Sequence, residues 1–269
     1  MYELFAKEDV RCSVTSRTHV RDTSLRDFFQ GSYGFIPLER IADTFGFVEE
    51  FTELYGGRAY DPRHVLSHRD VEELYDLGVG IKLCLQNHFV TRKDCEENRA
   101  FLARYHRKGN VIICVSEELA RFVKEEFPDY SVEASIIKEV HDPAAIEACL
   151  GVFDLFTLPP ASNDNLGFLA SLPRKDRIIL FANARCLYHC NLRTCYWNVS
   201  VQTKRRSDPG FGVLKPPCSP GSPNKSEYVL FDVDQLYEMG FRHFKWIIPQ
   251  PQIHAQAGLK PGLYKLPRN

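Results

Sequence analysis

The sequence has no surplus of charge of either sign and no long apolar run near its start. It contains 34 Lys and Arg residues against 35 Asp and Glu residues, a formal net charge of -1, so no overall field would draw the protein onto nucleic acid or a membrane. Charged residues interrupt every apolar run of residues 1–22, so this segment predicts neither a signal peptide nor a membrane span. We therefore expect a cytoplasmic protein without a membrane span.

Several motifs that carry catalytic chemistry are also missing. The sequence has no glycine loop that would cradle a phosphate and no strand–turn–helix serine elbow, and its histidines do not fall at the spacing of a known triad. These residues alone therefore do not supply the acid, base and nucleophile of a hydrolase.

What the sequence does have is enough apolar residues for a large core and nine cysteines. Its 269 residues, 44% of them hydrophobic, predict a single domain over residues 1–269. Cys84 and Cys114 lie within apolar, strand-like runs and are expected to be reduced core residues. In a reducing compartment, clustered cysteines more often bind metal or carry out redox chemistry than form disulfides.

From residue 67 onward, short β-branched runs alternate with amphipathic segments, which is typical of parallel strands joined by crossover helices. Helices are expected at 67–78, 91–109, 116–129, 142–151, 163–173 and 232–240. Strands are expected at 79–86, 110–116, 131–140, 151–160, 177–186, 227–232 and 241–249. Near-continuous apolar strands suit an α/β fold of the TIM-barrel-like (β/α) type, although a doubly wound open sheet would give a similar pattern.

The two ends of the chain and one long loop are less regular. Residues 32–57 give a helical pattern through Ile41, Phe45 and Val48, so the barrel could be incomplete or distorted at its N-terminus. Residues 207–227 are rich in Pro, Gly and Ser and predict a flexible loop that could cover a site. Residues 250–269 are expected to form an extended tail.

Three cysteines follow directly after the apolar strand that ends near residue 182. Cys186, Cys190 and Cys195 therefore lie at the carboxyl end of a strand, which is where β/α folds place their sites. Their spacing lets a compact turn bring the sulfur atoms together on a soft metal or an iron–sulfur cluster. Cys218, in the flexible loop, is the expected fourth ligand, and His189 and Cys12 are weaker alternatives. We place an iron–sulfur cluster ahead of a structural zinc because the cysteines occupy the functional edge of the fold.

Other residues near these cysteines are candidates for binding a substrate. Arg185 and Arg193 flank the cysteines and could bind an anionic group or tune the charge of a cluster. Tyr196 could stack a planar ligand or simply cover the metal site. Asn87 follows a strand and would point to the same edge, although capping of the next helix explains it equally well.

The order of these segments resembles the collagenase-like peptidase family, peptidase family U32, over residues 54 to 247. The resemblance rests on a strand that ends in Asn87, a strand around Ala134 and Ser135, the strand that leads to the cysteines, and a closing segment with Gly240 and Lys245. It implies a β/α barrel.

The better-understood members of that family resemble oxygen-independent hydroxylation factors that act on ubiquinone precursors or RNA bases. By position, the resemblance implies a [4Fe-4S] cluster on Cys186, Cys190, Cys195 and Cys218. The predicted function is a redox or hydroxylation reaction on a small planar molecule or nucleobase, with an electron donor or another protein as a possible partner. The alternatives are a collagenase-like peptidase, or a non-catalytic module that holds zinc.

Overall fold

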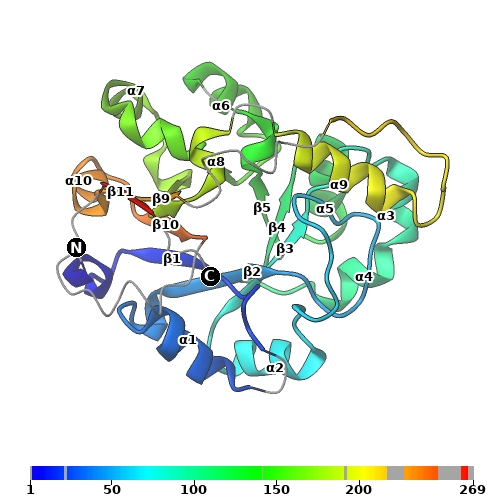
Figure 1. The fold of residues 1–269 in the computed structure, drawn as a ribbon, viewed down its shortest axis with the longest axis horizontal. Helices are drawn as coiled ribbons and strands as arrows, with labels where there is room; N and C mark the ends of the chain where they lie inside the picture. The colour runs from blue at the N-terminus through cyan, green and yellow to red at the C-terminus, as the bar shows by residue number, and fades with distance from the viewer. Residues whose placement is uncertain are drawn as a thin grey trace.

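The computed structural model describes residues 2–20, 23–140, 142–190, 193–216, 227–247 and 262–265. Its centre is a closed barrel in which all neighbouring strands run parallel, in the order β1-β10-β7-β6-β5-β4-β3-β2 (Figure 1). The barrel strands are β1 (Arg11–Thr15), β2 (Ile41–Gly46), β3 (Gly80–Leu85), β4 (Val111–Cys114), β5 (Ser131–Ala134), β6 (Leu155–Thr157), β7 (Ile178–Phe181) and β10 (His243–Trp246). The structure thus confirms the predicted α/β fold of the TIM-barrel type.

The barrel is complete at its N-terminal side, where the sequence pattern is ambiguous. Strand β1 pairs with both β2 and β10, and this closes the ring. Residues 41–46 form β2 and not part of the helix expected over residues 32–57. The helix of this region is α1, which ends at Tyr33. The spacing of Ile41, Phe45 and Val48 suggests a helix, but a strand that is buried on both faces carries no alternating pattern that would distinguish it.

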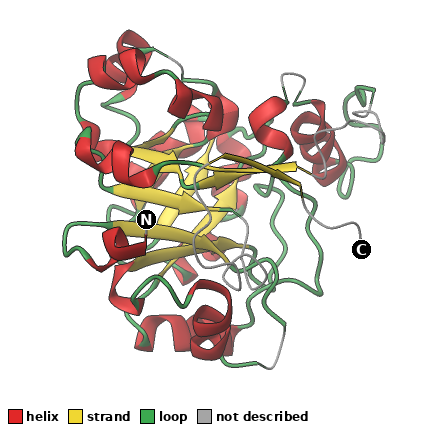
Figure 2. Cartoon of the chain, turned by 60° about the vertical axis from the view of Figure 1, so that its left-hand side comes forward, coloured by secondary structure: helices red, strands yellow, loops and turns green. Residues whose placement is uncertain are grey.

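Helices surround the barrel, as Figure 2 shows with strands in yellow inside and helices in red outside. The α-helices are α1 (Leu25–Tyr33), α2 (His68–Asp76), α3 (Arg92–Glu97), α4 (Arg99–Arg104), α5 (Glu117–Glu126), α6 (Pro143–Cys149), α7 (Leu166–Ser171), α8 (Cys186–His189), α9 (Thr194–Lys204) and α10 (Val233–Glu238). Short 3-10 helices are η1 (Tyr2–Ala6), η2 (Leu38–Arg40), η3 (Ile136–Lys138), η4 (Pro160–Asp164) and η5 (Lys175–Arg177).

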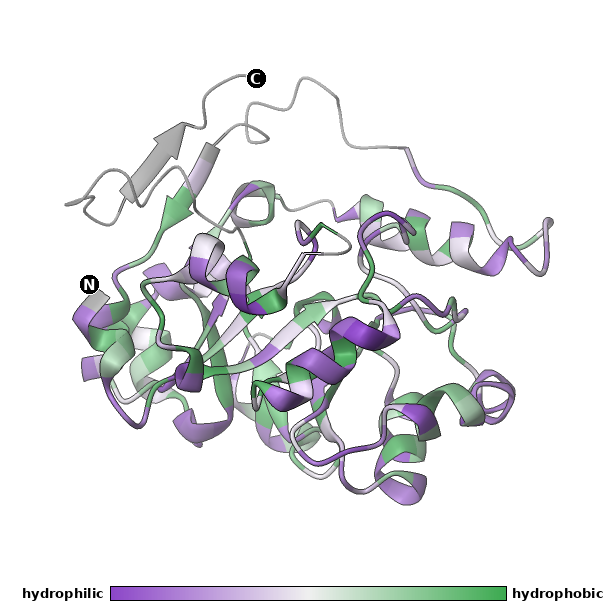
Figure 3. Cartoon of the chain, turned by 90° about the horizontal axis from the view of Figure 1, so that it is seen from below, coloured by the Kyte–Doolittle hydropathy of each residue, from purple (hydrophilic) through white to green (hydrophobic). Residues whose placement is uncertain are grey.

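Local sequence explains where several of these helices begin. Helix α2 starts at a capping box in which Ser67 and Asp70 satisfy each other's backbone amides, and α3 starts at a second box formed by Thr91 and Asp94. Many helices are amphipathic, and Figure 3 shows green apolar and purple polar residues alternating along the same helices. The apolar side chains pack onto the barrel and form one continuous core. Among the helices that the structure describes, none is long and apolar enough to cross a membrane.

A second, smaller sheet lies beside the barrel. It joins β8 (Asn183–Ala184), β9 (Glu227–Leu230) and β11 (Gly262–Lys265) in antiparallel pairs. The strand expected at 227–232 therefore belongs to this sheet and not to the barrel. β11 falls within the segment 250–269 that the sequence predicts to be an extended tail, and the other residues of that segment lie outside the described part. The described part of the predicted loop, residues 207–216, contains no helix or strand.

Candidate active site at the carboxyl ends of the strands

Four charged side chains meet inside the barrel. The Lys82 ammonium lies 3.1 Å from Asp43 Oδ1 and 2.7 Å from Glu133 Oε2. The Lys245 ammonium lies 2.9 Å from Glu133 Oε1. All four side chains are buried, so two ammonium groups face two carboxylates and the charges balance.

Three uncharged groups complete this interior network. Lys82 donates a hydrogen bond to Ser13 Oγ at 2.8 Å, and Ser13 Oγ lies 2.8 Å from His243 Nε2. Thr157 donates to Glu133 Oε1 at 2.5 Å. The strand register explains the meeting, because Ser13 is level with Asp43 on one side and with Lys245 on the other. A buried network in which every charge has a partner fixes a single packing of the core.

The pKa values of these groups reflect both burial and the neighbouring charges, and for Asp43 burial raises the pKa against the opposing effect of Lys82. Burial would raise the pKa of Glu133, but Lys245 and Lys82 hold it well below its usual range. Burial lowers the pKa of Lys245 against the opposing effect of Glu133. Burial, and then the charge of Lys82, also lower the pKa of His243 well below its ordinary value of 6.5, so this ring is neutral.

Above this network lies the end of the barrel where the strands finish, which we call the mouth. Lys245 Nζ stands 4.8 Å from the centre of the Phe45 ring. The Arg17 guanidinium, two residues beyond the end of β1, stands 5.9 Å from the same ring and 5.5 Å from that of Phe47. Arg17 Nη2 also lies 3.8 Å from the sulfur of Cys84. Positively charged side chains therefore extend from the barrel interior to the mouth, where they pack against the aromatic rings of Phe45 and Phe47.

The guanidinium of Arg17 lies in an environment that stabilises its positive charge poorly. Burial lowers the pKa of its guanidinium, and the charge of nearby Arg58 lowers it further, while Cys84 and Tyr196 act in the opposite direction. Its Nε atom is buried and has no hydrogen-bond partner in the part of the chain that the structure describes. A cation in such a place is stabilised only partly by the protein.

Arg58 reaches the mouth from the loop that follows β2. Its guanidinium lies 5.7 Å from the centre of the Tyr196 ring and forms a hydrogen bond with Cys186. Arg58 keeps an exposed surface, and its partial burial alone would lower its pKa, but Tyr196, Cys186 and Cys195 together raise the pKa above the ordinary value. Gly57 has a φ of +78°, a conformation that favours glycine, and this turn places Arg58 at the mouth.

The structure brings two of the four predicted metal ligands to one place. Cys186 begins α8 and Cys195 lies in the first turn of α9, and both lie near enough to Arg58 to raise its pKa. The sulfur of Cys190 accepts a hydrogen bond from the backbone amide of Arg193 at 3.5 Å. Cys218 lies outside the described residues. Within those that are described, no three His, Cys, Asp or Glu side chains gather closely enough to hold a metal ion, so the four-cysteine cluster stays a prediction.

The other predicted site residues differ in their surroundings. Tyr196 is buried under Arg58 and belongs to the mouth. Arg193 forms an ion pair with Glu139, and Arg185 is an exposed residue at the start of α8. Asn87 is buried and tied to the fold, because its side-chain amide donates to the carbonyl of Glu53 at 2.9 Å and its oxygen accepts from the amide of Phe89.

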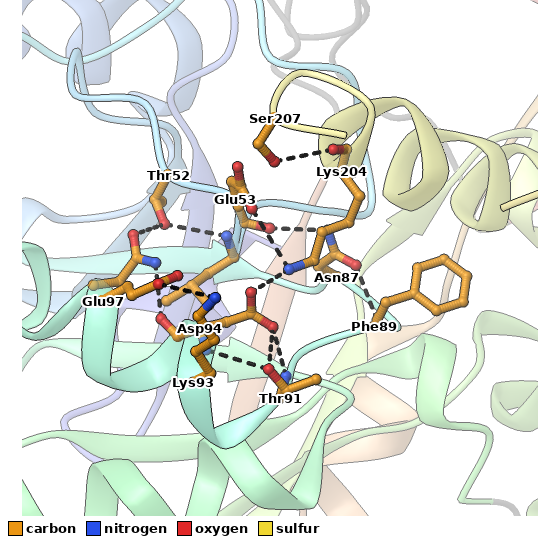
Figure 4. A network of polar contacts seen from close by, with 12 residues as sticks. Thr52, Glu53, Asn87, Phe89, Thr91, Lys93, Asp94, Glu97, Lys204 and Ser207 are labelled. Carbon is orange, nitrogen blue, oxygen red and sulfur yellow. Dashed lines mark hydrogen bonds and ion pairs between the residues drawn. The ribbon is translucent and has the colours of Figure 1, made fainter. Parts of the chain in front are cut away.

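Helix α9, which carries Cys195 and Tyr196, is anchored to the barrel through its second half. Figure 4 shows Lys204 reaching Asp94 and Glu53 beside Asn87. The hydroxyl of Ser200 lies 2.9 Å from Nδ1 of His88, and the backbone carbonyl of Ser200 accepts a hydrogen bond from the side-chain amide of Asn87. Asn87 therefore positions the helix that builds one wall of the mouth.

Reasoning from the sequence alone missed the two arginines and most of the interior network. A charged residue in an otherwise apolar strand was the available signal, as with Lys82 in Gly80–Leu85 and Glu133 in Ser131–Ala134. Because barrel strands are buried, such a residue must find a partner inside. No comparable signal marks Arg17 and Arg58, which lie in loops.

Comparisons with known proteins place the fold but not the family. No family model matches the sequence, and no curated protein matches it either. Among solved structures, the chain is similar to "The Structure of the U32 Peptidase Mk0906", with a TM-score of 0.57 and 14% sequence identity over 94% of each chain. The similarity covers nearly the whole chain. At this identity it establishes that the two proteins share a barrel fold of the U32 peptidase kind.

Proposed function

We propose that the chain is an enzyme of the U32 peptidase type that acts on a peptide or another amide-bearing substrate at the mouth. One observation carries the proposal: side chains from five separate segments, Arg17, Arg58, Cys84, Cys186 and Tyr196, meet at the carboxyl ends of the strands. This is the end at which barrels of this class carry their active sites. The shared fold with a U32 peptidase supports the choice of an amide-bearing substrate.

The experiment is an assay of the purified chain on a set of defined peptides, with release of new amino groups as the readout. We expect slow cleavage that is lost in Cys186→Ser, because Cys186 is the half-buried thiol that contacts Arg58. Cys149→Ser is the matched control, since Cys149 is a half-buried thiol at the end of α6. Equal activity of Cys186→Ser and the control would remove Cys186 from the site, and absence of any cleavage would reject the peptidase reaction.

A second candidate function is redox chemistry on an iron–sulfur cluster held by Cys186, Cys190, Cys195 and Cys218. The observation that favours it is that Cys186 and Cys195 both lie near enough to Arg58 to raise its pKa, because a cluster with four thiolates is anionic and a nearby cation offsets its charge. The described residues alone do not fit a cluster, since they gather no three ligands. When bound, such a cluster would transfer electrons to a planar substrate such as a nucleobase.

Anaerobic purification followed by metal analysis separates the two candidates. Iron and acid-labile sulfide with visible charge-transfer absorbance would favour the cluster, while stoichiometric zinc in colourless protein would favour the structural alternative. Cys190→Ala should abolish iron binding, whereas Cys149→Ala should leave the iron content unchanged. Full iron content in Cys190→Ala would show that the ligand assignment is wrong.

A further inference from the structure

Two guanidinium groups meet at the mouth without a carboxylate between them. Arg17 follows β1 and Arg58 lies in the loop after β2. The neighbouring groups with the largest effects on their pKa values are the other arginine in the case of Arg17, the thiols of Cys84, Cys186 and Cys195, and the phenol of Tyr196. Among the residues that the structure describes, neither arginine forms an ion pair. This contrasts with buried Lys82, Lys245 and Lys204, which all contact carboxylates.

The placement of the two arginines is fixed by the fold. Arg17 rests over Phe45 and Phe47, and its backbone amide donates to Thr15 Oγ1 at 3.2 Å. The Arg58 loop is seated by Gly56, where an added Cβ would lie 2.3 Å from the backbone carbon of Gln86, and by the left-handed Gly57. Only glycine allows such a close approach. The loop is therefore built to hold Arg58 against the barrel.

The buried, unpartnered Nε of Arg17 is an independent sign of a missing partner. An arginine presents a planar fork of N–H donors that matches the two oxygens of a carboxylate or phosphate group. The aromatic floor beneath Arg17 excludes water and strengthens such a contact. An anion placed between two guanidiniums would also offset their mutual repulsion.

We propose that Arg17 and Arg58 together bind an oxyanion, the carboxylate or phosphate group of the substrate, at the mouth of the barrel. This inference rests on the proposed function only in taking the bound molecule to be the substrate. The reacting part of that molecule would then lie near Cys186 and Tyr196. A peptide with a free terminal carboxylate and a phosphorylated molecule share this chemistry.

Calorimetric titration of the purified chain tests the proposal, with three probes at constant ionic strength. The probes are an N-acetylated dipeptide with a free carboxylate, the same dipeptide as its C-terminal amide, and inorganic phosphate. We expect the carboxylate or the phosphate to bind at least about tenfold more tightly than the amide, because each charge-assisted contact contributes to affinity. Whichever of the two binds more tightly identifies the source of the oxyanion.

Variants locate the binding. Arg58→Gln should weaken it by about tenfold or more, and Arg17→Lys, which keeps the charge but loses the planar fork, should weaken it less. Arg63→Gln is the matched control, because Arg63 lies on the same loop, is exposed, and pairs with Asp61. The control should bind as the natural chain does.

Three results would overturn the inference. The first is equal affinity for the free carboxylate, phosphate and amide probes, and the second is unchanged oxyanion affinity in Arg58→Gln. The third is an anaerobically isolated cluster whose absorbance changes in Arg58→Gln while no oxyanion binds to the protein. The last would assign the arginines to the cluster. Failure of the proposed peptidase reaction gives a different pattern, in which oxyanion binding persists but no peptide is cleaved.

Discussion

The barrel interior and the mouth differ in whether their positively charged side chains are paired with carboxylates. Inside, Lys82 and Lys245 face Asp43 and Glu133, and two cations are matched by two carboxylates. At the mouth, Arg17 contacts thiol and aromatic groups but no carboxylate among the described residues. Buried positive charges are therefore matched by carboxylates in the barrel interior, whereas at the mouth positive charge is in excess.

This difference separates charges that hold the fold from charges that are available to a ligand. A buried ion pair costs desolvation that its own Coulomb attraction offsets, so removing one partner leaves an uncompensated charge. A buried cation without a protein partner has the same desolvation cost, but no Coulomb attraction within the protein offsets that cost. A bound anion can supply the missing attraction. The interior network should thus govern stability, and the mouth should govern binding.

The largest expected effect is the loss of the shared carboxylate, Glu133. In Glu133→Gln, Asp43 remains as the only described carboxylate facing the two buried lysines. We expect the free energy of unfolding to fall by about 3–5 kcal/mol, as measured by urea denaturation.

Glu117→Gln is the control for that measurement. Glu117 is a more exposed carboxylate whose Oε1 lies 2.8 Å from Lys138 Nζ, so its removal should cost no more than about 1 kcal/mol. If the two variants lost equal stability, the interior network would contribute no more to the stability of the fold than a surface ion pair does.

The next effect is a pH dependence that originates in His243. Burial, and then Lys82, lower its pKa well below 6.5, so in the folded protein the ring stays neutral while in the unfolded chain it takes up a proton. The unfolded state therefore binds more protons below about pH 6.5, and stability should fall with decreasing pH by up to about 1.4 kcal/mol per pH unit. His243→Gln should remove this part of the slope between about pH 6.5 and about pH 5. Parallel slopes in the variant and the natural chain would contradict a neutral buried ring.

The sequence predicted the barrel better than it predicted the site. Alternating helix and strand patterns from residue 67 onward are local, and the structure has its α2 and β3 where they indicated. Strand β2 was missed because burial on both faces leaves no period of two. The interior network depends on which residues of distant strands become level, as Ser13 does with Lys245. That register is not visible in any local pattern.

The cysteines and the arginines of the mouth show the same limit. Cys186, Cys190 and Cys195 are close in sequence, and this proximity made them candidates. Arg17 and Arg58 lie in separate loops and meet only because β1 and β2 are neighbours in the ring. A spacing argument has no way to pair residues that the barrel itself brings together.

A smaller effect of opposite sign is expected at Arg17. Replacing it in Arg17→Met removes a cation that burial destabilises and that no carboxylate among the described residues compensates. We expect the variant to be more stable by about 1 kcal/mol in urea denaturation while it loses oxyanion binding, as functional sites often trade stability for activity. Lys82→Met, in contrast, should be destabilising, because it leaves Asp43 without its cation. A destabilised Arg17→Met would place Arg17 with the structural charges of the interior.

The smallest change in stability is expected for Arg58→Gln. Arg58 is exposed and forms no ion pair within the described part of the chain, so the unfolding free energy without ligand should shift by no more than about 0.5 kcal/mol. The two proteins should differ once an oxyanion that binds is added. At a concentration of about ten times Kd, it should stabilise the natural chain by about 1.4 kcal/mol and the variant by much less. Thermal unfolding with and without the anion measures both quantities. A loss above about 1 kcal/mol without ligand would mean that Arg58 supports the fold, because a residue kept only for binding has no such role in the free protein.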